Sequence, residues 1–490
     1  MKRVAGMFRT SLIVLALFAN GAMAQTSPLG HQKNQLPEIG VVASNAISID
    51  RERTIGDAYM RQLRAQAPIV NDPLLEEYLQ DLGNRLVTQA DNVKFPFRFF
   101  WINNSDINAF AFFGGHVAVH TGLLIAADNE SELASVLAHE ITHVTQRHIA
   151  RSIEASQNNS PLQMLSMLGG VLVSMANPEA GMAILGAGMA GAQQAAINYT
   201  RDNEKEADRI GIQMLSKSGF DPNAAGTFFG KLAERYRYKS KPPAFLLTHP
   251  LPESRIADAR SRADMYAVPP QSRQVSESFA LAKVRVLARY SDDVANNRDY
   301  FEKIQNHPLP AWQQAGTYGL VLLDFADEKY AQAEKTLAGL LAAQPDNLFF
   351  IDAMTDILLE QKRVDDAIAL LDPMAKRMPR NRVVSLNLAN ALIKGRQYER
   401  AIALLKDYLL INPEHTLSYQ LLADAYSESK QKMEMHQARA EFFALLSVYP
   451  KAIDELQTAY NFTGEQRLEQ QRIRARIDQL REAERKLKSL

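Results

Sequence analysis

The segment His-Glu-Ile-Thr-His at residues 139–143 carries the clearest chemistry in this chain of 490 residues. Residues four positions apart in a helix share one face, so the imidazoles of His139 and His143 can bind one zinc ion. Glu140 is rotated from His139 by about 100°, and its carboxylate can reach a zinc-bound water without being a ligand. Zinc brings the pKa of such a water to about 7, and a carboxylate can then take its proton during attack on a peptide carbonyl. Taken alone, the motif also occurs by chance in unrelated helices.

A zinc site of this kind needs a third ligand, and the composition narrows the choice. The chain contains no cysteine, so any metal must be held by His, Asp or Glu. Glu204 and Asp208 lie four residues apart in a polar helical segment, 198–216, and can share one face. Glu204 would complete a set of two histidines and one glutamate, with an open position for water. Asp208 could orient a ligand histidine or give a proton to the leaving amine, whereas a solvated acidic face is the simpler interpretation of Glu206.

Three segments together resemble the M48 family of zinc metallopeptidases in their order and spacing. They are residues 139–143, Glu-Lys-Glu-Ala-Asp at 204–208 and His-Pro-Leu-Pro-Glu-Ser-Arg at 249–255, and the resemblance covers roughly residues 50–265. It implies a gluzincin-type α+β metallopeptidase domain that binds one Zn²⁺ per chain. It also implies His139, His143 and Glu204 as zinc ligands, Glu140 as the general base and Asp208 as the proton donor.

The third segment, residues 249–255, contains two residues, His249 and Arg255, for which two roles each are considered. His249 precedes Pro250 in a rigid loop that the family pattern places near the site. One hypothesis is that His249 occupies or shields the fourth zinc position and keeps the enzyme latent; the alternative is that it orients substrate or packs. Arg255 either anchors this loop or contacts a substrate carbonyl.

Three other histidines lie between the motifs. His116 and His120 flank a short alternating segment before the metal helix. An edge strand at this place could pair with an extended substrate, but structural or surface roles are favoured for both residues. His148 lies nine residues after His139, on a different helical face, and is expected at the surface.

These residues must be positioned by a few short strands and several helices. The alternating aromatic run 95–102 and the segment 116–120 predict two strands. Asp128 and Asn129 can cap the metal helix, which is expected to run to about Arg151, and Glu132 is placed to complete a capping box. Residues 164–196 hold six glycines and five methionines and are interrupted by Pro178. They predict a mobile lid, a hairpin that contacts a membrane peripherally, or packed helices; each half is too short to span a bilayer.

A different organisation follows a Pro-rich linker near residues 269–273. Proline recurs at 345, 379 and 413, alanine at 333, 367 and 401, and leucine at 337, 371 and 405, always 34 residues apart. The column Tyr330, Val364 and Tyr398 has the same period. A unit of about 34 residues with a small Ala in its second helix and a closing Pro is typical of tetratricopeptide repeats. Such helix pairs stack into a solenoid with a concave binding surface and need a polar end cap.

The N-terminus indicates export. Basic residues at positions 2, 3 and 9 precede an apolar run, and Ala22-Met-Ala24 offers small residues for cleavage after Ala24. The 55 basic and 55 acidic side chains of the whole chain balance, and cleavage would leave a net charge near −3. No transmembrane anchor is expected after cleavage. A net charge near −3 argues against nucleic-acid binding, because proteins that bind nucleic acids usually carry a basic surface. Export without cysteine fits a bacterial periplasm.

The expected fold is therefore mainly α: a metallopeptidase domain with a small β-sheet, followed by an α-helical tetratricopeptide-repeat solenoid. The expected boundaries are 1–24 for the signal peptide, 25–267 for the peptidase domain, 268–310 for the linker and helical lead-in, 311–464 for the repeats and 465–490 for a charged capping helix. The whole pattern resembles the M48 branch of the Gram-negative periplasm. That resemblance implies a zinc endopeptidase with a chaperone-like role, which degrades misfolded or stalled outer-membrane β-barrel proteins, promotes their assembly and meets the assembly machinery through the repeats. The alternative is a mainly non-proteolytic chaperone or scaffold of outer-membrane assembly with a latent zinc site.

Overall fold

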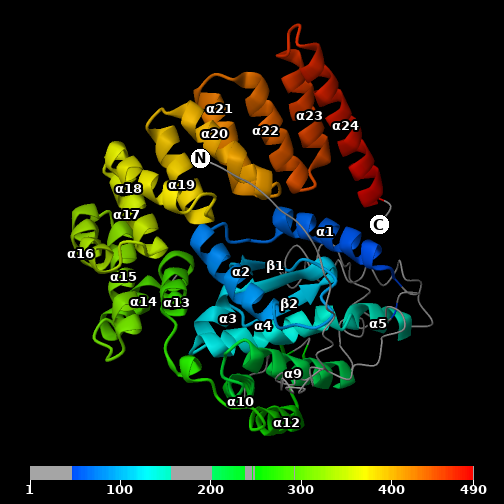
Figure 1. The fold of residues 1–490 in the computed structure, drawn as a ribbon, viewed down its shortest axis with the longest axis vertical. Helices are drawn as coiled ribbons and strands as arrows, with labels where there is room; N and C mark the ends of the chain where they lie inside the picture. The colour runs from blue at the N-terminus through cyan, green and yellow to red at the C-terminus, as the bar shows by residue number, and fades with distance from the viewer. Residues whose placement is uncertain are drawn as a thin grey trace, which may run out of the picture. The chain divides into compact units, whose positions relative to one another are not determined.

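A computed structural model describes Ala43 and residues 47–155, 201–237, 245–246, 249–291 and 293–488 (Figure 1). The expected signal peptide, the Gly- and Met-rich segment 164–196 and Thr248 lie outside the described residues. The elements up to residue 263 are helices around one small sheet, and those from residue 277 onward are helices alone. This arrangement confirms the mainly α fold expected from the sequence.

The sheet has three short strands, β1 (Arg98–Ile102), β2 (Ala109–Phe112) and β3 (His116–His120). β3 is central, parallel to β1 and antiparallel to β2. The predicted strand 116–120 is confirmed, and β1 begins three residues later than the predicted one. Because β3 lies between two partners, the edge position considered for residues 116–120 is wrong; the edges belong to β1 and β2. No separate strand was predicted at β2, whose Phe-rich run lies directly before a turn with positive φ at Gly114 and Gly115.

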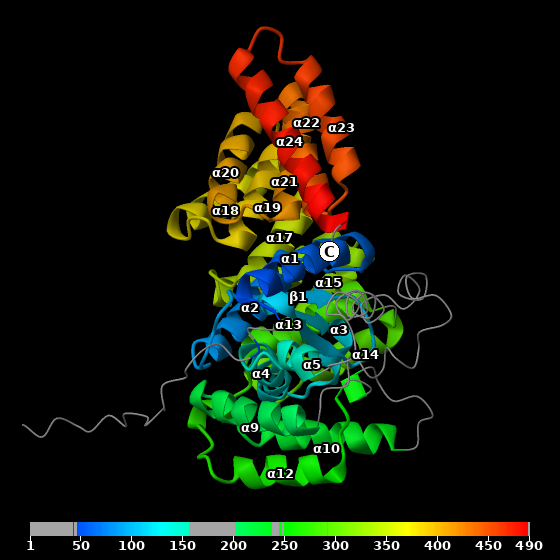
Figure 2. The ribbon, with the colours of Figure 1, turned by 90° about the vertical axis from the view of Figure 1, so that its right-hand side faces the viewer.

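Helices cover the sheet and carry most of the functional residues. Before the sheet lie α1 (Ile49–Gln66) and α2 (Pro73–Val87). After it follow α3 (Thr121–Ala126), α4 (Glu130–Thr145), α5 (His148–Ala155), α9 (Arg201–Lys217), α10 (Ala224–Tyr236) and α12 (Glu253–Ala263). α4 contacts β2 and α2 on one side and α9 and α10 on the other, so that it is almost entirely buried (Figure 2).

The start of α4 follows the sequence, but its end does not. Asn129 accepts a hydrogen bond from the backbone N–H of Glu132 at 3.0 Å, and the Glu132 carboxylate accepts one from the N–H of Asp128 at 2.8 Å. These two bonds satisfy donors at the helix start, close to the expected capping box. The helix was expected to reach Arg151, yet it ends at Thr145 and a new helix begins at His148. The break lies at Arg147, which has a left-handed φ of 52°.

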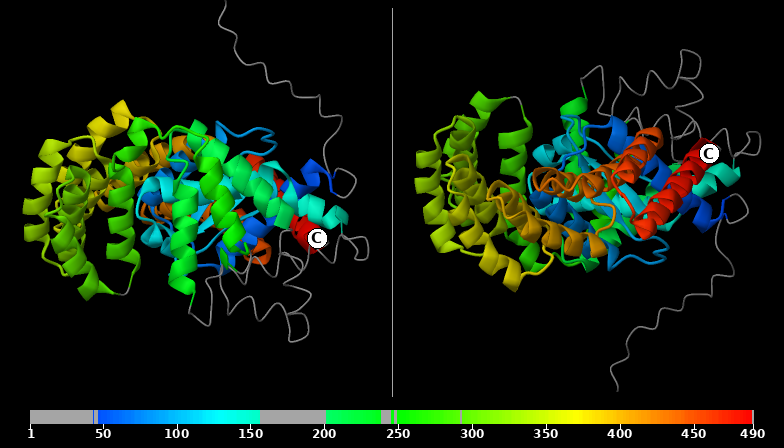
Figure 3. Two further views of the ribbon diagram at one scale, coloured as in Figure 1. Left: turned by 90° about the horizontal axis from the view of Figure 1, so that it is seen from below. Right: turned by 90° about the horizontal axis from the view of Figure 1, so that it is seen from above.

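The repeat region consists of stacked helix pairs. They are α15 (Pro310–Ala326) with α16 (Tyr330–Ala343), α17 (Leu348–Glu360) with α18 (Val364–Arg377), α19 (Arg382–Lys394) with α20 (Tyr398–Ile411), and α21 (Thr416–Glu428) with α22 (Lys432–Leu445). The pairs follow a curved path (Figure 3). The second helices of the first three pairs begin at the periodic residues 330, 364 and 398. The periodic Ala and Leu side chains at 333, 367, 401, 337, 371 and 405 are fully buried, which confirms the repeat assignment.

Two further helices close the chain at its C-terminal end. α23 (Tyr449–Asn461) packs on α22, and α24 (Arg467–Lys488) packs on α23. The charged helix α24 buries Ile473, Ile477 and Leu480 and leaves its polar face outward. One apolar stripe against the stack and a solvated outer face are what an end cap of a solenoid requires.

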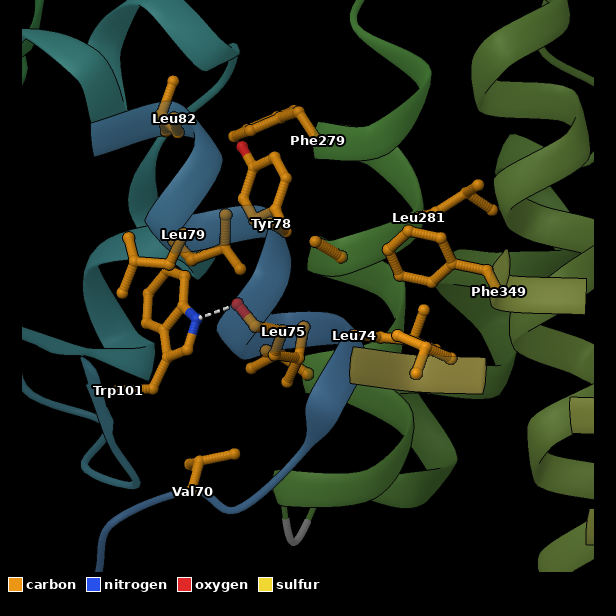
Figure 4. Close-up of a cluster of buried hydrophobic side chains, with 14 of the residues drawn as sticks. Val70, Leu74, Leu75, Tyr78, Leu79, Leu82, Trp101, Phe279, Leu281 and Phe349 are labelled. Carbon is orange, nitrogen blue, oxygen red and sulfur yellow. Dashed lines mark hydrogen bonds between the residues drawn. The ribbon is translucent and has the colours of Figure 1, made fainter. Parts of the chain in front are cut away.

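The segment between the peptidase domain and the repeats is a short 3₁₀ turn, Pro270–Arg273, followed by α13 (Glu277–Tyr290) and α14 (Val294–Ile304). α13 contacts α2 and α3 as well as α15. Figure 4 shows Phe279 and Leu281 of α13 between α2 and Phe349 of α17, and Trp101 donating to the Leu75 carbonyl at 2.8 Å. One apolar cluster therefore runs from the peptidase domain into the repeats. Among the described residues, no helix combines the length and the apolar character needed to cross a membrane.

Candidate metal centre

Four buried side chains converge at the contact between α4 and α9. His139 and His143 come from α4, Glu204 from the first turn of α9, and His249 from the loop before α12. One ligand atom from each lies within 4.8 Å of the others. The two helices approach closely because residue 211 is Gly: a Cβ there would lie 3.2 Å from the backbone N of His139. The structure thus brings together the three predicted zinc ligands and the loop histidine.

The ligand atoms face one another at short distances. The Nε2 atoms of His139 and His143 are 3.0 Å apart, and each lies 3.5 Å from a carboxylate oxygen of Glu204. The Nδ1 atom of His249 lies 3.3 Å from Nε2 of His139 and 3.1 Å from Oε1 of Glu204. Imidazole nitrogens and a carboxylate oxygen in such a set are donors that zinc prefers in proteins.

The charge around this point also fits a divalent cation. Three buried carboxylates, those of Glu140, Glu204 and Asp208, lie here, and Arg255 pairs with the last two. Burial alone would lower the pKa of His139, but hydrogen bonds to Asp208 and Glu204 outweigh it and raise that pKa to about 10. The pocket therefore favours an additional positive charge where the ligand atoms meet, which zinc would supply.

Asp208 and Arg255 form the layer behind the ligands. Asp208 Oδ1 lies 3.0 Å from Nδ1 of His139, and both of its oxygens accept hydrogen bonds from Arg255 at 2.8 Å. Burial would raise the pKa of the Asp208 carboxyl, but His139 and Arg255 hold it below its usual value. Arg255 also lies 2.8 Å from Glu204 and donates to the carbonyl of Pro250 at 2.7 Å. Of the two roles considered from the sequence, these contacts favour the anchor of the His249 loop.

Glu140 lies between the ligand cluster and the sheet edge. Its side chain is fully buried, and its Oε2 accepts a hydrogen bond from the backbone N–H of Ala111 on β2 at 3.0 Å. Its Oε1 lies 3.4 Å from Nε2 of His249. Burial raises the pKa of the Glu140 carboxyl. A carboxylate with a raised pKa beside metal ligands is suited to accepting a proton during hydrolysis.

The remaining histidines differ from one another. His116 and His120 are buried on the central strand, and His116 Nε2 lies 3.1 Å from Asp57, in agreement with structural roles. The surface position expected for His148 is wrong: this ring is fully buried, and its Nδ1 lies 2.8 Å from Nδ1 of His143. Burial lowers the pKa of His148 to about 4, so its ring is neutral at pH 7. A surface position would follow from one straight helix, but the chain breaks at Arg147 and brings His148 against His143.

Two contacts at this site could not be predicted from the helical spacing of the sequence. Glu206, interpreted as a solvated residue, lies 3.2 Å from Nε2 of His148 and accepts from Arg151 at 2.7 Å. The second is the Ala111 N–H on β2, which is a backbone group. Gly, Asn or Asp inside the predicted helix would have indicated a break, because these residues adopt positive φ most readily. Residue 147 is Arg, so its positive φ could not be predicted from its type.

Comparisons with known proteins agree with this geometry. Residues 73–263 match Peptidase family M48, and residues 358–432 match a tetratricopeptide repeat family. The chain is 45% identical over 484 residues to the "Beta-barrel assembly-enhancing protease" of Escherichia coli K12, covering 97% of each chain. It is 46% identical over 461 residues to the protein of that name from Yersinia pestis, covering 94% of each. A more distant relative is the mitochondrial metalloendopeptidase OMA1 of Schizosaccharomyces pombe, 28% identical over 222 residues, which are 43% of this chain and 61% of that protein.

Identity at this level over almost the whole length shows the class of the protein. The chain belongs to peptidase family M48, and it is a zinc-dependent metalloprotease. Relatives that match it along 94% or more of its length are named β-barrel assembly-enhancing proteases.

Proposed function

We propose that this chain is a periplasmic zinc endopeptidase that degrades misfolded or stalled outer-membrane β-barrel proteins and promotes their assembly. The observation that carries the enzymatic part is the buried cluster of His139, His143 and Glu204 with Glu140 beside it. The similarity along 97% of the chain to a β-barrel assembly-enhancing protease supports the substrate class. The sequence of residues 1–24 supports export to the periplasm, with cleavage after Ala24.

In this proposal His139, His143 and Glu204 hold the zinc ion. When bound, zinc supplies a Lewis acid that activates water and polarises the peptide carbonyl. Glu140 accepts the proton of the attacking water, and the hydrogen bond from the Ala111 N–H of β2 holds its carboxylate in place. Asp208 orients His139 through its 3.0 Å contact; because Arg255 holds both of its oxygens, this role suits it better than proton donation.

His249 is the regulatory element of the proposal. Its ring lies between the ligand atoms and Glu140, 3.1 Å from Glu204 and 3.4 Å from Glu140. A side chain in this place can fill the fourth zinc position and exclude water, which would keep the enzyme latent until the loop moves. His249→Ala should raise basal proteolysis and leave zinc bound. Unchanged zinc geometry together with unchanged basal proteolysis in this variant would exclude the latent role.

The repeats would supply the chaperone-like part. A stack of helix pairs offers an extended concave surface for a polypeptide or for the β-barrel assembly machinery. Binding there raises the effective concentration of a client at the zinc site of the same chain. The alternative function, a mainly non-proteolytic scaffold with a latent zinc site, is favoured by one observation, the position of His249 over the cluster.

Glu140→Gln separates the two functions. The variant keeps the shape of the side chain and an oxygen that can accept from Ala111, so the fold and zinc content should be retained. Cleavage of an unfolded β-barrel substrate by the mature chain should fall by at least about 10²-fold, the usual contribution of a general base. Cleavage at the original rate would contradict the proposed enzyme. Loss of cleavage with full support of barrel assembly would show that the scaffold role is independent of proteolysis.

A further inference from the structure

His148 lies directly behind His143, on the side opposite the metal ligands. The Nδ1 atoms of the two rings are 2.8 Å apart, whereas Nε2 of His143 lies 3.0 Å from Nε2 of His139. Both rings are buried, with exposed fractions of 0% for His148 and 2% for His143. One edge of the His143 ring is therefore held by His148 while the other faces the ligand cluster.

The contact continues beyond His148 to the surface of the domain. Nε2 of His148 lies 3.2 Å from Oε2 of Glu206. The same oxygen accepts a hydrogen bond from Arg151 at 2.7 Å, and the Glu206 side chain is 27% exposed. The row Glu206, His148 and His143 thus connects a charged pair at the surface with a residue of the metal centre.

The positions of hydrogens along this row follow from the chemistry of neutral imidazole. A neutral ring carries one N–H and one nitrogen lone pair. If Nε2 of His143 gives its lone pair to zinc, its hydrogen is on Nδ1 and must be donated to Nδ1 of His148. The hydrogen of His148 is then on Nε2 and is donated to Glu206. This arrangement gives each N–H of the row an acceptor, so Glu206 and His148 together favour the tautomer that His143 needs as a ligand.

The break between α4 and α5 brings His148 to this place. In an uninterrupted helix, residues 143 and 148 would point about 140° apart. Arg147 instead has a φ of 52°, and its buried guanidinium donates to Glu52 of α1 at 2.6 and 2.9 Å and to the carbonyl of Ile47 at 2.7 Å. These bonds fix the chain reversal, so α5 starts with the His148 ring against His143.

We propose that His148 is a positioning residue for His143 and that it acts through the hydrogen bond between the two Nδ1 atoms, with Glu206 holding the ring of His148. The inference rests on the proposed function in one respect, the assignment of His143 as a zinc ligand. It gives the two ligand histidines different supports: a carboxylate, Asp208, for His139 and a second imidazole for His143. Such outer partners fix ring orientation and raise the basicity of the ligand.

Two isosteric variants of His148 separate the roles of its two nitrogens. The amide oxygen of Asn can replace Nδ1 and still accept from His143, whereas the amide of Gln reaches the place of Nε2 and cannot. Zinc affinity of the metal-free full-length mature chain is measured by competition with a chelator. We expect His148→Gln to weaken zinc binding by about 10- to 100-fold and His148→Asn by less than about threefold. Glu206→Ala should weaken it by a few fold.

Controls distinguish this inference from the proposed zinc site. His143→Ala should lose zinc binding altogether; retained affinity would contradict the proposed ligand set itself. Thermal unfolding of each metal-free variant checks that the fold is intact, and Glu206→Ala, at a partly exposed position, decides the matter if His148→Gln does not fold. Equal weakening by Asn and Gln would show that His148 only packs. Unchanged zinc affinity in both His148→Gln and Glu206→Ala would overturn the proposal.

Discussion

The metal centre and the junction with the repeats both contain buried charge, and they differ in how that charge is compensated. At the metal centre, Arg255 pairs with Glu204 and Asp208, and the Glu140 carboxylate lies beside them without an arginine or lysine partner among the described ion pairs. At the junction with the repeats, Arg285 of α13 lies 2.6 Å from Asp72 and 2.8 Å from Asp352. The first cluster leaves nitrogen and oxygen atoms directed at one point, where a metal fits. The second supplies its own cation, so it joins helices and needs no ligand.

The junction cluster connects three parts of the chain. Asp72 caps α2 and also accepts from the backbone N–H groups of Leu74 and Leu75, while Asp352 lies on the repeat helix α17. Burial would lower the pKa of Arg285, but Asp352 and Asp72 outweigh it and hold that pKa well above its usual value. A permanently charged guanidinium thus ties the peptidase domain to the repeats, whereas the metal centre depends on an ion that can be removed.

The largest expected effect is on the metal centre. Glu204→Gln replaces an anionic ligand by a neutral amide, and proteolysis of an unfolded substrate should fall by at least about 10²-fold because metal binding is weakened. Metal analysis of the purified variant and initial cleavage rates measure this. The urea midpoint of the metal-free chain should change little, since Asp208 still pairs with Arg255. Full zinc occupancy with full activity would remove Glu204 from the site.

The second prediction concerns the junction. Arg285→Met removes the cation that directly contacts the buried carboxylates of Asp72 and Asp352, and it should destabilise the chain by about 3–5 kcal/mol, as measured by urea unfolding, without changing zinc affinity. Its matched control is Arg289→Met on the same helix: that arginine is 28% exposed and pairs with Asp356, so less than about 1 kcal/mol should be lost. Equal losses in the two variants would show that burial does not distinguish these pairs.

Neutralising the junction sharpens the second prediction. Adding Asp72→Asn and Asp352→Asn to Arg285→Met removes the uncompensated charges and should restore part of the lost stability, because an intact buried ion pair often contributes little net free energy. The Asn at position 72 can still cap α2. No recovery in the urea midpoint would indicate that the hydrogen bonds of Arg285, including the one to Tyr318 at 2.9 Å, matter more than its charge.

Zinc removal should act on one cluster only. At a zinc concentration of about 1,000 times the dissociation constant, binding stabilises the folded chain by about 4 kcal/mol. A chelator should therefore lower the thermal midpoint of the wild-type chain, and the same loss should occur in Arg285→Met. If the chelator no longer lowered the thermal midpoint in Arg285→Met, the two clusters would be coupled and would not contribute independently to stability.

The smallest expected effect is a pH dependence from Lys283 of α13, a buried ammonium that donates to the Ala127 carbonyl. Burial lowers its pKa to about 8 from an ordinary value of 10.5. The unfolded chain then binds more protons between these values, so stability rises with pH in this window, by at most about 1.4 kcal/mol per pH unit. Lys283→Met should remove that slope in urea unfolding between pH 8 and 10; an unaltered slope would assign it to other groups.

The sequence predicts much of this architecture because its strongest signals are periodic. The 34-residue columns anticipate the starts of α16, α18 and α20, and the alternation at 116–120 anticipates β3. The order of the three peptidase motifs anticipates which side chains meet around His139. In each case the spacing of side chains along a regular element determines the contact.

The features that could not be predicted from the sequence lie where regular helices and strands end. β2 is four residues long and follows no polar alternation, so only its pairing with β3 defines it as a strand. The break at Arg147 depends on a buried ion pair with Glu52, 95 residues away, and His148 meets His143 because of it. The dual contact of Arg255 with Asp208 and Pro250 likewise depends on tertiary packing. Long-range contacts of this kind leave no local pattern.

The most direct test of the zinc centre is a crystal structure of the mature chain with zinc, located by its anomalous scattering. We expect one zinc ion per chain within bonding distance of Nε2 of His139, Nε2 of His143 and a carboxylate oxygen of Glu204, with His249 or a water in the fourth position. A zinc ion bound elsewhere, or none at this cluster in a chain that cleaves its substrate, would contradict it.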